Sequence, residues 1–146
     1  MRVVVTFGTF DLFHVGHLRI LERARALGDR LVVGVSTDSL NLAKKGRYPV
    51  YPQEERIEIV RSLRGVDEVF VEESLEQKRD YLVRWKADVL VMGHDWEGRM
   101  DEFKDICEVV YLPRTENIST TEVEEFIQRR MPKVPRWLTQ GKRRAG

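Results

Sequence analysis

The sequence predicts an α/β fold in which five parallel strands form one open, doubly wound sheet. Short apolar runs typical of buried strands alternate with longer segments whose apolar residues repeat at helical spacing. A strand that follows such a helical segment pairs in parallel with the preceding strand through a right-handed crossover. Polar stretches follow three of the strands, and sheets of this type bind ligands at the carboxyl ends of their strands. The same pattern therefore predicts where a binding site should lie.

The first predicted strand, residues 3–7, leads through a turn into a helix. The turn and the helix start read Gly-Thr-Phe-Asp-Leu-Phe-His-Val-Gly-His over residues 8–17. Apolar residues then recur at helical spacing as far as Leu27, and Gly28 stands where a C-terminal cap is expected. The next apolar run, residues 31–36, is predicted to be the second strand and completes a parallel βαβ unit.

Residues 41–52 are polar and basic and contain two prolines, so they are predicted to form a surface loop. A helix should follow over about residues 52–63. The alternation continues with a strand, a helix and a strand over residues 66–71, 75–85 and 88–92.

A polar stretch at residues 93–98 follows the fourth strand, and the fifth strand is predicted over residues 107–112. Thr120 or Thr121 is then predicted to cap a helix that reaches about Arg130. Three polar segments distant in sequence should therefore converge on one crevice. No internal repeat and no Gly-x-Gly-x-x-Gly dinucleotide motif is present.

A chain of 146 residues fits a single domain, predicted over residues 1–131, with a basic C-terminal tail over residues 132–146. The 25 basic and 24 acidic residues leave a formal charge of only +1, so no global field favours nucleic acid or a membrane. We therefore expect a small-molecule partner. The single cysteine, Cys107, excludes an intrachain disulfide, and no apolar run approaches the roughly 18 residues of a membrane span. These features predict a soluble, cytoplasmic protein.

His14 and His17 would project from the first turn of the first helix, where free N–H groups and the helix dipole favour an anion. That anion is predicted to be a phosphate. A purely structural histidine pair is the alternative. The segment Arg-Thr-Glu-Asn-Ile-Ser-Thr-Thr, residues 114–121, adds a second set of phosphate-binding groups. Arg114 offers a bidentate cation, and the hydroxyl and N–H groups of residues 119–121 could cradle the β- and γ-phosphates of a nucleotide.

No Ser-His-Asp or Cys-His arrangement is evident. A phosphate monoester acceptor is already largely a dianion at neutral pH, so positioning and charge stabilisation would suffice without an enzymic base. Mg²⁺ would neutralise further charge, and Asp11 could help to hold it directly or through water. Basic residues could hold the acceptor phosphate, although each could equally be an ordinary surface residue: Lys44, Lys45, Arg47 and Lys78.

These motifs resemble the cytidylyltransferases, whose superfamily shares a His-x-Gly-His signature with class I aminoacyl-tRNA synthetases. The resemblance runs from residue 3 to about residue 127 and includes blocks at residues 8–17, 66–69, 76–78, 96–98 and 114–121. The sequence is most similar to members that make CDP-glycerol from CTP and sn-glycerol 3-phosphate. This resemblance implies a Rossmann-like domain and direct in-line attack of the acceptor phosphate on the α-phosphorus of CTP, with release of pyrophosphate.

The resemblance also implies roles for individual residues. The catalytic groups would be His14, His17 and Arg114. Further contacts to CTP would come from Thr9, Phe10, Gly16, Thr115, Ile118, Ser119, Thr120 and Thr121. The substrate-binding set would comprise Asp11, Lys44, Arg56, Lys78, Asp95 and Trp96, with Arg56 supporting the site. The implied cofactor is Mg²⁺, and the implied assembly is a homodimer.

The sequence departs from the family pattern at four places that bear on specificity: His94 replaces an acidic residue, Asn117 a glycine and Leu75 an aromatic, and the basic loop before Arg56 is one residue longer. A transferase acting on phosphocholine, phosphoethanolamine or FMN, with CTP or ATP, therefore stays open. A non-catalytic nucleotide sensor also stays open, whereas a tRNA synthetase fragment is disfavoured by length and by the lack of an anticodon-binding region. CDP-glycerol would feed a teichoic acid or another surface polymer.

Overall fold

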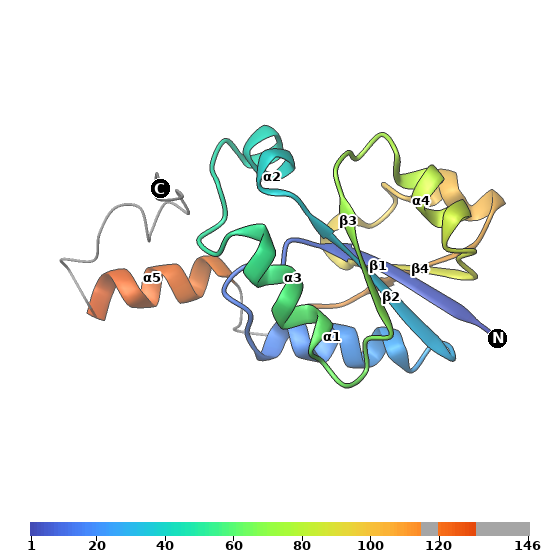
Figure 1. Cartoon of the computed structure of the whole chain (residues 1–146), viewed down its shortest axis with the longest axis horizontal. Coiled ribbons are helices and arrows are strands. Elements are labelled where there is room, and N and C mark those ends of the chain that lie inside the picture. Colours follow the sequence, from blue (N-terminus) through green and yellow to red (C-terminus); the bar gives the residue numbers. More distant parts are fainter. Residues whose placement is uncertain (115–119, 131–146) are drawn as a thin grey trace.

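A computed structural model of the chain describes residues 1–114 and 120–130 (Figure 1). Five parallel strands form one sheet in the order β3-β2-β1-β4-β5, which confirms the predicted fold class. The strands are β1 (Val3–Gly8), β2 (Arg30–Ser36), β3 (Glu68–Glu72), β4 (Val89–Gly93) and β5 (Glu108–Leu112). The chain builds outward from β1 to β3 and then returns to place β4 on the other side of β1. This reversal opens a crevice at the carboxyl ends of β1 and β4.

Helices cover both faces of the sheet. They are α1 (Val15–Arg25), α2 (Asp38–Lys45), α3 (Gln53–Arg61), α4 (Lys78–Arg84) and α5 (Thr120–Arg130), with short 3₁₀ turns η1 (His94–Trp96) and η2 (Asp101–Asp105). Alternate strand residues point to opposite faces. Val4 packs with Leu21 of α1 and Val60 of α3, whereas Val5 packs with Leu82 of α4 and Phe103 of η2. Figure 1 shows α1 and α3 together, away from α4.

The prediction of a surface loop over residues 41–52 was wrong in its first part. The hydroxyl of Thr37 accepts the N–H of Leu40, and this N-cap starts α2, which runs to Lys45. Gly46 then ends the helix with a left-handed φ of 74°, a conformation that glycine adopts without strain. Lys44 therefore lies on the last helical turn instead of on a loop.

Other element boundaries differ from the prediction by a few residues. The predicted helix over residues 75–85 begins only at Lys78, and η2 was not predicted. Thr120 and Thr121 both lie inside α5, so neither is its N-cap.

Cys107 is partly buried, and burial raises the pKa of its thiol. The predicted tail lies outside the described residues, and the described helices include none with the length and apolar character of a membrane span.

Candidate active site

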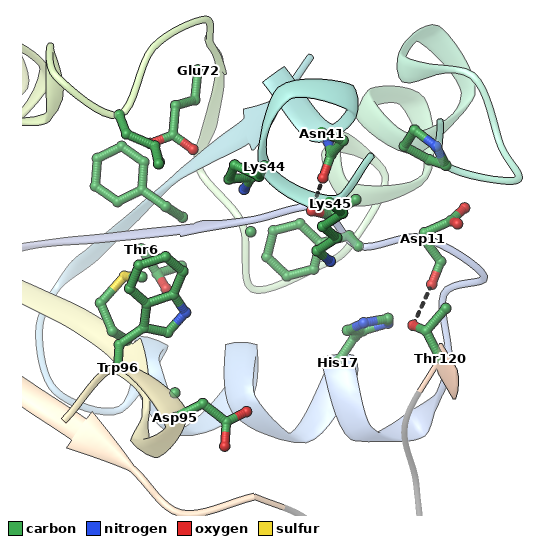
Figure 2. Close-up of a pocket in the computed structure, with 18 of the residues that line it drawn as sticks. Thr6, Asp11, His17, Asn41, Lys44, Lys45, Glu72, Asp95, Trp96 and Thr120 are labelled. Atoms are coloured by element: carbon green, nitrogen blue, oxygen red, sulfur yellow. Dashed lines mark hydrogen bonds between the residues drawn. The ribbon is translucent and has the colours of Figure 1, made fainter. Parts of the chain in front are cut away.

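A cavity of about 530 Å³ lies at the carboxyl ends of the strands (Figure 2). Eleven of the predicted site residues line it, and they come from separate elements and loops: Thr9, Phe10, Asp11, His17, Lys44, Lys45, Arg47, Lys78, Asp95, Trp96 and Thr120. The described residues His14, Gly16, Arg56, Arg114 and Thr121 are not among its lining. The predicted nucleotide contacts Thr115, Ile118 and Ser119 lie outside the described residues.

The loop after β1 holds an uncommon backbone conformation. Phe10 and Leu12 have φ values of 56° and 47°, in the left-handed region that costs energy for residues other than glycine. The ring of Phe10 folds back over Gly8, where a Cβ atom would lie only 2.8 Å from it. The same ring packs edge-on against His17, with 5.6 Å between ring centroids. Gly8 is therefore required for the packing that places Phe10 beside the histidine.

His14 and His17 are held by the helix turn that they open. The Nδ1 atom of His14 accepts the N–H of Gly16 at 3.0 Å, and the Nδ1 atom of His17 accepts the N–H of His14 at 3.2 Å. Because each Nδ1 is an acceptor, the proton of each neutral ring is on Nε2. The buried Nε2 of His14 has no hydrogen-bond partner in the described part of the chain. Both Nε2–H groups are therefore unpaired donors within the described residues, and of the two rings only His17 lines the cavity.

The environment keeps both histidines neutral. Burial lowers the pKa of His14, partly offset by Glu122. Burial, His14 and Lys45 together lower the pKa of His17 to about 3. Near pH 7 the pair therefore donates hydrogen bonds without carrying positive charge.

Arg56 is fully buried and binds only to protein groups in the described structure. Its guanidinium donates to the carbonyl oxygens of Tyr51, Thr9 and Ser36 and to the carboxylate of Asp38. The predicted supporting role of Arg56 agrees with this network, and its assignment to the substrate-binding set stays a prediction. Arg56 acts as a positioning residue that fixes the backbone of Thr9.

Asp11 has a similar structural role. Its two carboxylate oxygens accept the N–H groups of Val50 at 2.7 Å, Tyr51 at 2.9 Å and Leu12 at 3.1 Å. The carboxylate thereby clamps the loop after β1 to the segment before α3. Asp11 also lines the cavity, and its predicted roles in substrate binding and in holding a metal, directly or through water, stay predictions.

Two lysines project toward the cavity from α2 and α4. Lys78 is 3% exposed, its Nζ donates to Oε2 of Glu72 at 2.7 Å, and the same Nζ lies 3.7 Å from the centroid of the Phe7 ring. Burial lowers the pKa of Lys78, and Glu72 opposes that shift. Burial likewise lowers the pKa of Lys44, with Glu72 again opposing. Sequence reasoning missed Glu72, although its place at the end of β3 could have indicated it.

The opposite wall is formed by η1 and the residues after it. Trp96 is partly buried, and the guanidinium carbon of Arg99 lies 4.6 Å from the centroid of its ring. Asp95 is exposed, with one oxygen 3.7 Å from Nδ1 of His94, which is also exposed. This wall therefore offers a planar aromatic face and adjacent charged groups. Arg99 was not predicted to belong to the site.

The two predicted phosphate-binding segments meet at the start of α5. The hydroxyl of Thr120 donates to the carbonyl oxygen of Asp11 at 3.0 Å, which Figure 2 shows as a dashed line. Arg47 and Glu124 add an ion pair at 2.9 Å between the segment after α2 and α5. Arg114 is exposed and lies two residues after the end of β5, while Thr121 is exposed in the first turn of α5.

Comparison with known proteins relates this chain to nucleotide-transferring enzymes. A family model described as cytidylyltransferase-like matches residues 5–126. The chain is 55% identical over 128 residues to glycerol-3-phosphate cytidylyltransferase from Bacillus subtilis, covering 87% of this chain and 98% of the relative. The corresponding Staphylococcus aureus protein is 48% identical over 125 residues, covering 86% and 94%.

More distant similarity extends to enzymes with other names and to solved structures. An FAD synthase from Pyrococcus abyssi is 41% identical over 136 residues, covering 88% of this chain and 91% of the relative. The crystal structure of a lipopolysaccharide core biosynthesis protein from Thermoplasma volcanium aligns with a TM-score of 0.67 at 24% identity. The alignment covers 81% of this chain and 99% of the solved structure, and it supports only the assignment of the fold.

Proposed function

The chain belongs to the cytidylyltransferase-like family, and on that premise we propose that it transfers the cytidylyl group of CTP to sn-glycerol 3-phosphate. The observation that carries the proposal is 55% identity across 98% of the length of a glycerol-3-phosphate cytidylyltransferase. The products are CDP-glycerol and pyrophosphate. A cavity lined by the neutral His17, which stacks on His14, and by two buried or half-buried lysines supports this assignment.

The reaction proceeds by direct displacement at the α-phosphorus. An oxygen of the acceptor phosphate forms the new P–O bond, and the bond to the pyrophosphate oxygen breaks on the opposite side. The attacking phosphate is largely a dianion near neutral pH, so no residue has to remove a proton. The Nε2–H groups of His14 and His17 donate to the charge that develops on the α-phosphate. Their neutral state lets them do so without a change of protonation.

Basic side chains bind the acceptor phosphate on one side of the reacting phosphorus and the β- and γ-phosphates of CTP on the other. On the acceptor side, Lys44 and Lys78 bind the phosphate of the alcohol through charge-assisted hydrogen bonds. On the nucleotide side, Arg114 and the segment up to Thr121 take the β- and γ-phosphates, with the guanidinium fork engaging two oxygens. Thr9 and Phe10 contact the nucleotide from the loop after β1, and Trp96 provides an apolar face for a flat group.

Mg²⁺ fits this site as a partner of the triphosphate. The described residues contain no group of three His, Cys, Asp or Glu side chains that could hold a metal ion. Asp11 accepts three backbone N–H groups, and one oxygen of Glu72 accepts a hydrogen bond from the ammonium of Lys78. Mg²⁺ commonly keeps several waters and binds through substrate phosphates. We therefore propose that the ion enters with CTP and neutralises charge on the leaving pyrophosphate.

The family resemblance also leads us to propose a cytoplasmic homodimer whose product feeds a teichoic acid or a similar surface polymer. Light scattering coupled to size-exclusion chromatography tests the assembly, with a mass near twice that of one chain expected.

An acceptor panel with pyrophosphate detection tests the reaction. CTP and ATP are each combined with sn-glycerol 3-phosphate, phosphocholine, phosphoethanolamine and FMN. We expect pyrophosphate with CTP and glycerol 3-phosphate, together with CDP-glycerol identified by mass spectrometry. Turnover of ATP with FMN alone would instead assign the chain to FAD synthesis, and nucleotide binding without any pyrophosphate would indicate a sensor.

A further inference from the structure

Glu72 is a buried carboxylate in the wall of a cavity proposed to take two anionic substrates. It is the last residue of β3, it is 1% exposed, and it lines the same cavity as Lys44 and Lys78. A buried carboxylate is costly unless it is paired, and a carboxylate close to a phosphate dianion repels it. The Glu72 carboxylate therefore needs a partner that compensates its charge. Its position near the acceptor phosphate also indicates a function in the site.

Lys78 supplies the compensation but leaves part of the carboxylate available. The ammonium of Lys78 binds Oε2 of Glu72 at 2.7 Å, and both side chains are almost fully buried. A carboxylate can accept about four hydrogen bonds. Within the described residues no side chain or backbone N–H donates to the other oxygen, Oε1. That oxygen can therefore accept a hydrogen bond from a ligand in the cavity.

The charges around Glu72 are arranged in a sequence across the site. Glu72 acts electrostatically on both lysines, which places it close to Lys44 as well as to Lys78. In Figure 2 Glu72 lies on the far side of Lys44 from His17. From His17 outward, the wall thus presents a neutral donor, then cations, then a carboxylate. A phosphorylated alcohol has the matching order, with the phosphate next to the reacting phosphorus and hydroxyl donors at the other end.

We propose that Glu72 determines acceptor specificity by accepting a hydrogen bond from a hydroxyl group of the phosphorylated alcohol. The inference rests on the proposed function, because it assigns the part of the acceptor beyond its phosphate. Two lysines and one carboxylate leave this cluster with a net charge of +1 (two positive, one negative). A neutral hydroxyl donor is therefore favoured there over an ammonium donor.

The test compares two acceptors that differ in their hydroxyl groups. The value of kcat/KM is measured for sn-glycerol 3-phosphate and for n-propyl phosphate, with Glu72→Gln, Glu72→Asp and the wild type. Since Lys78 offers only donors, the amide oxygen of Gln stays on Lys78 and its NH₂ group faces the cavity. We expect Glu72→Gln to lower kcat/KM for glycerol 3-phosphate about 10- to 100-fold. The value for propyl phosphate should change less than about threefold, and KM for CTP should be unchanged.

Two further variants separate the hydroxyl contact from charge compensation and folding. Glu72→Asp keeps the charge beside Lys78 but withdraws the oxygens by one methylene, so it should also lose the preference for glycerol 3-phosphate. Glu73→Gln changes the exposed neighbour and should behave as wild type. Equal losses on both acceptors, or no loss on either, would overturn the role of Glu72. A wild-type protein that makes no CDP-glycerol would instead overturn the proposed function.

Discussion

His14 and His17 stack with their ring centroids 3.9 Å apart and their planes inclined by 20°, and each ring also accepts a backbone N–H at the start of α1. One nitrogen of each ring therefore stabilises the helix start, while the other remains a donor. Substitution by alanine removes both contributions together. Variants that keep the hydrogen bond to the helix start but remove the Nε2–H donor separate the two contributions.

Asparagine at position 14 and glutamine at position 17 are such variants. Asparagine is among the best N-cap residues, and glutamine three positions later completes a capping box. We expect His14→Asn and His17→Gln each to lower kcat by about 10²- to 10⁴-fold, because a positioned donor to developing charge is lost. The free energy of unfolding should stay within about 1 kcal/mol of wild type. Near-normal kcat in either folded variant would remove that histidine from the reaction.

The depressed pKa of His17 predicts how stability depends on pH. Its pKa is about 3 in the folded protein against an ordinary value of 6.5, mainly because the ring is buried. Between these values the unfolded chain binds more protons, so stability rises with pH. The contribution is complete above pH 6.5 and is lost progressively as the pH falls toward 3.

Urea unfolding at a series of pH values from 7 to 4.5 measures this effect. The wild type should lose stability on acidification more steeply than His17→Gln, which has no titrating ring at this position. The same pKa predicts that the NMR signal of the His17 ring does not titrate between pH 5.5 and 8. A midpoint near 6.5 for that signal would contradict the neutral, buried state of the ring.

Local sequence pattern predicted the sheet and the edge at which the site lies. Apolar strand-like runs alternate with helical segments through most of the chain, and parallel strands bring their carboxyl ends to one edge, so loops distant in sequence had to converge. The short helix α2 was missed because its charged residues and the following prolines indicated a loop, although Thr37 carried a capping signal. Short amphipathic segments without a long apolar repeat are difficult to distinguish from loops.

The roles of Asp11 and Arg56 could not be predicted from local pattern. Asp11 accepts N–H groups 39 and 40 residues later in the chain, and Arg56 donates to a carbonyl oxygen 47 residues earlier. A carboxylate next to two histidines favours a metal or substrate role until these partners are known. Long-range hydrogen bonds to backbone groups leave no signature in spacing, so sequence alone identified these residues but not these contacts.

Lys44 and Lys78 should differ in what their removal does to the folded protein. Each change to alanine is expected to raise KM for glycerol 3-phosphate about tenfold or more, with little effect on KM for CTP. Lys78→Ala also leaves Glu72 buried without its partner, which should reduce the free energy of unfolding by about 3 to 5 kcal/mol. Lys44 is half-buried and forms no ion pair with another described residue, so Lys44→Ala should be much less destabilising.

Steady-state kinetics with each substrate varied in turn, together with urea unfolding, measure both effects. Lys104→Ala, an exposed lysine on η2, is the control and should match the wild type in both assays. Equal increases in KM for the two substrates would place the lysines outside the acceptor site.

Asp11 provides the sharpest distinction between a structural carboxylate and a metal ligand. It is 7% exposed, and its oxygens accept the N–H groups of Val50 at 2.7 Å and Tyr51 at 2.9 Å. Asp11→Asn keeps the shape but replaces one acceptor oxygen with an NH₂ donor, so one of these buried N–H groups loses its partner. We expect a loss of about 1 to 3 kcal/mol in the free energy of unfolding.

The Mg²⁺ concentration that gives half-maximal activity should stay within about twofold of wild type, because the proposed site holds the ion through the phosphates of CTP. Asp95→Asn, at an exposed carboxylate of the same cavity, tests whether any lining charge affects the metal requirement. A tenfold higher Mg²⁺ requirement in Asp11→Asn, with stability unchanged, would show that Asp11 binds the ion. The clamp between the loop after β1 and the segment before α3 would then be secondary to the metal role.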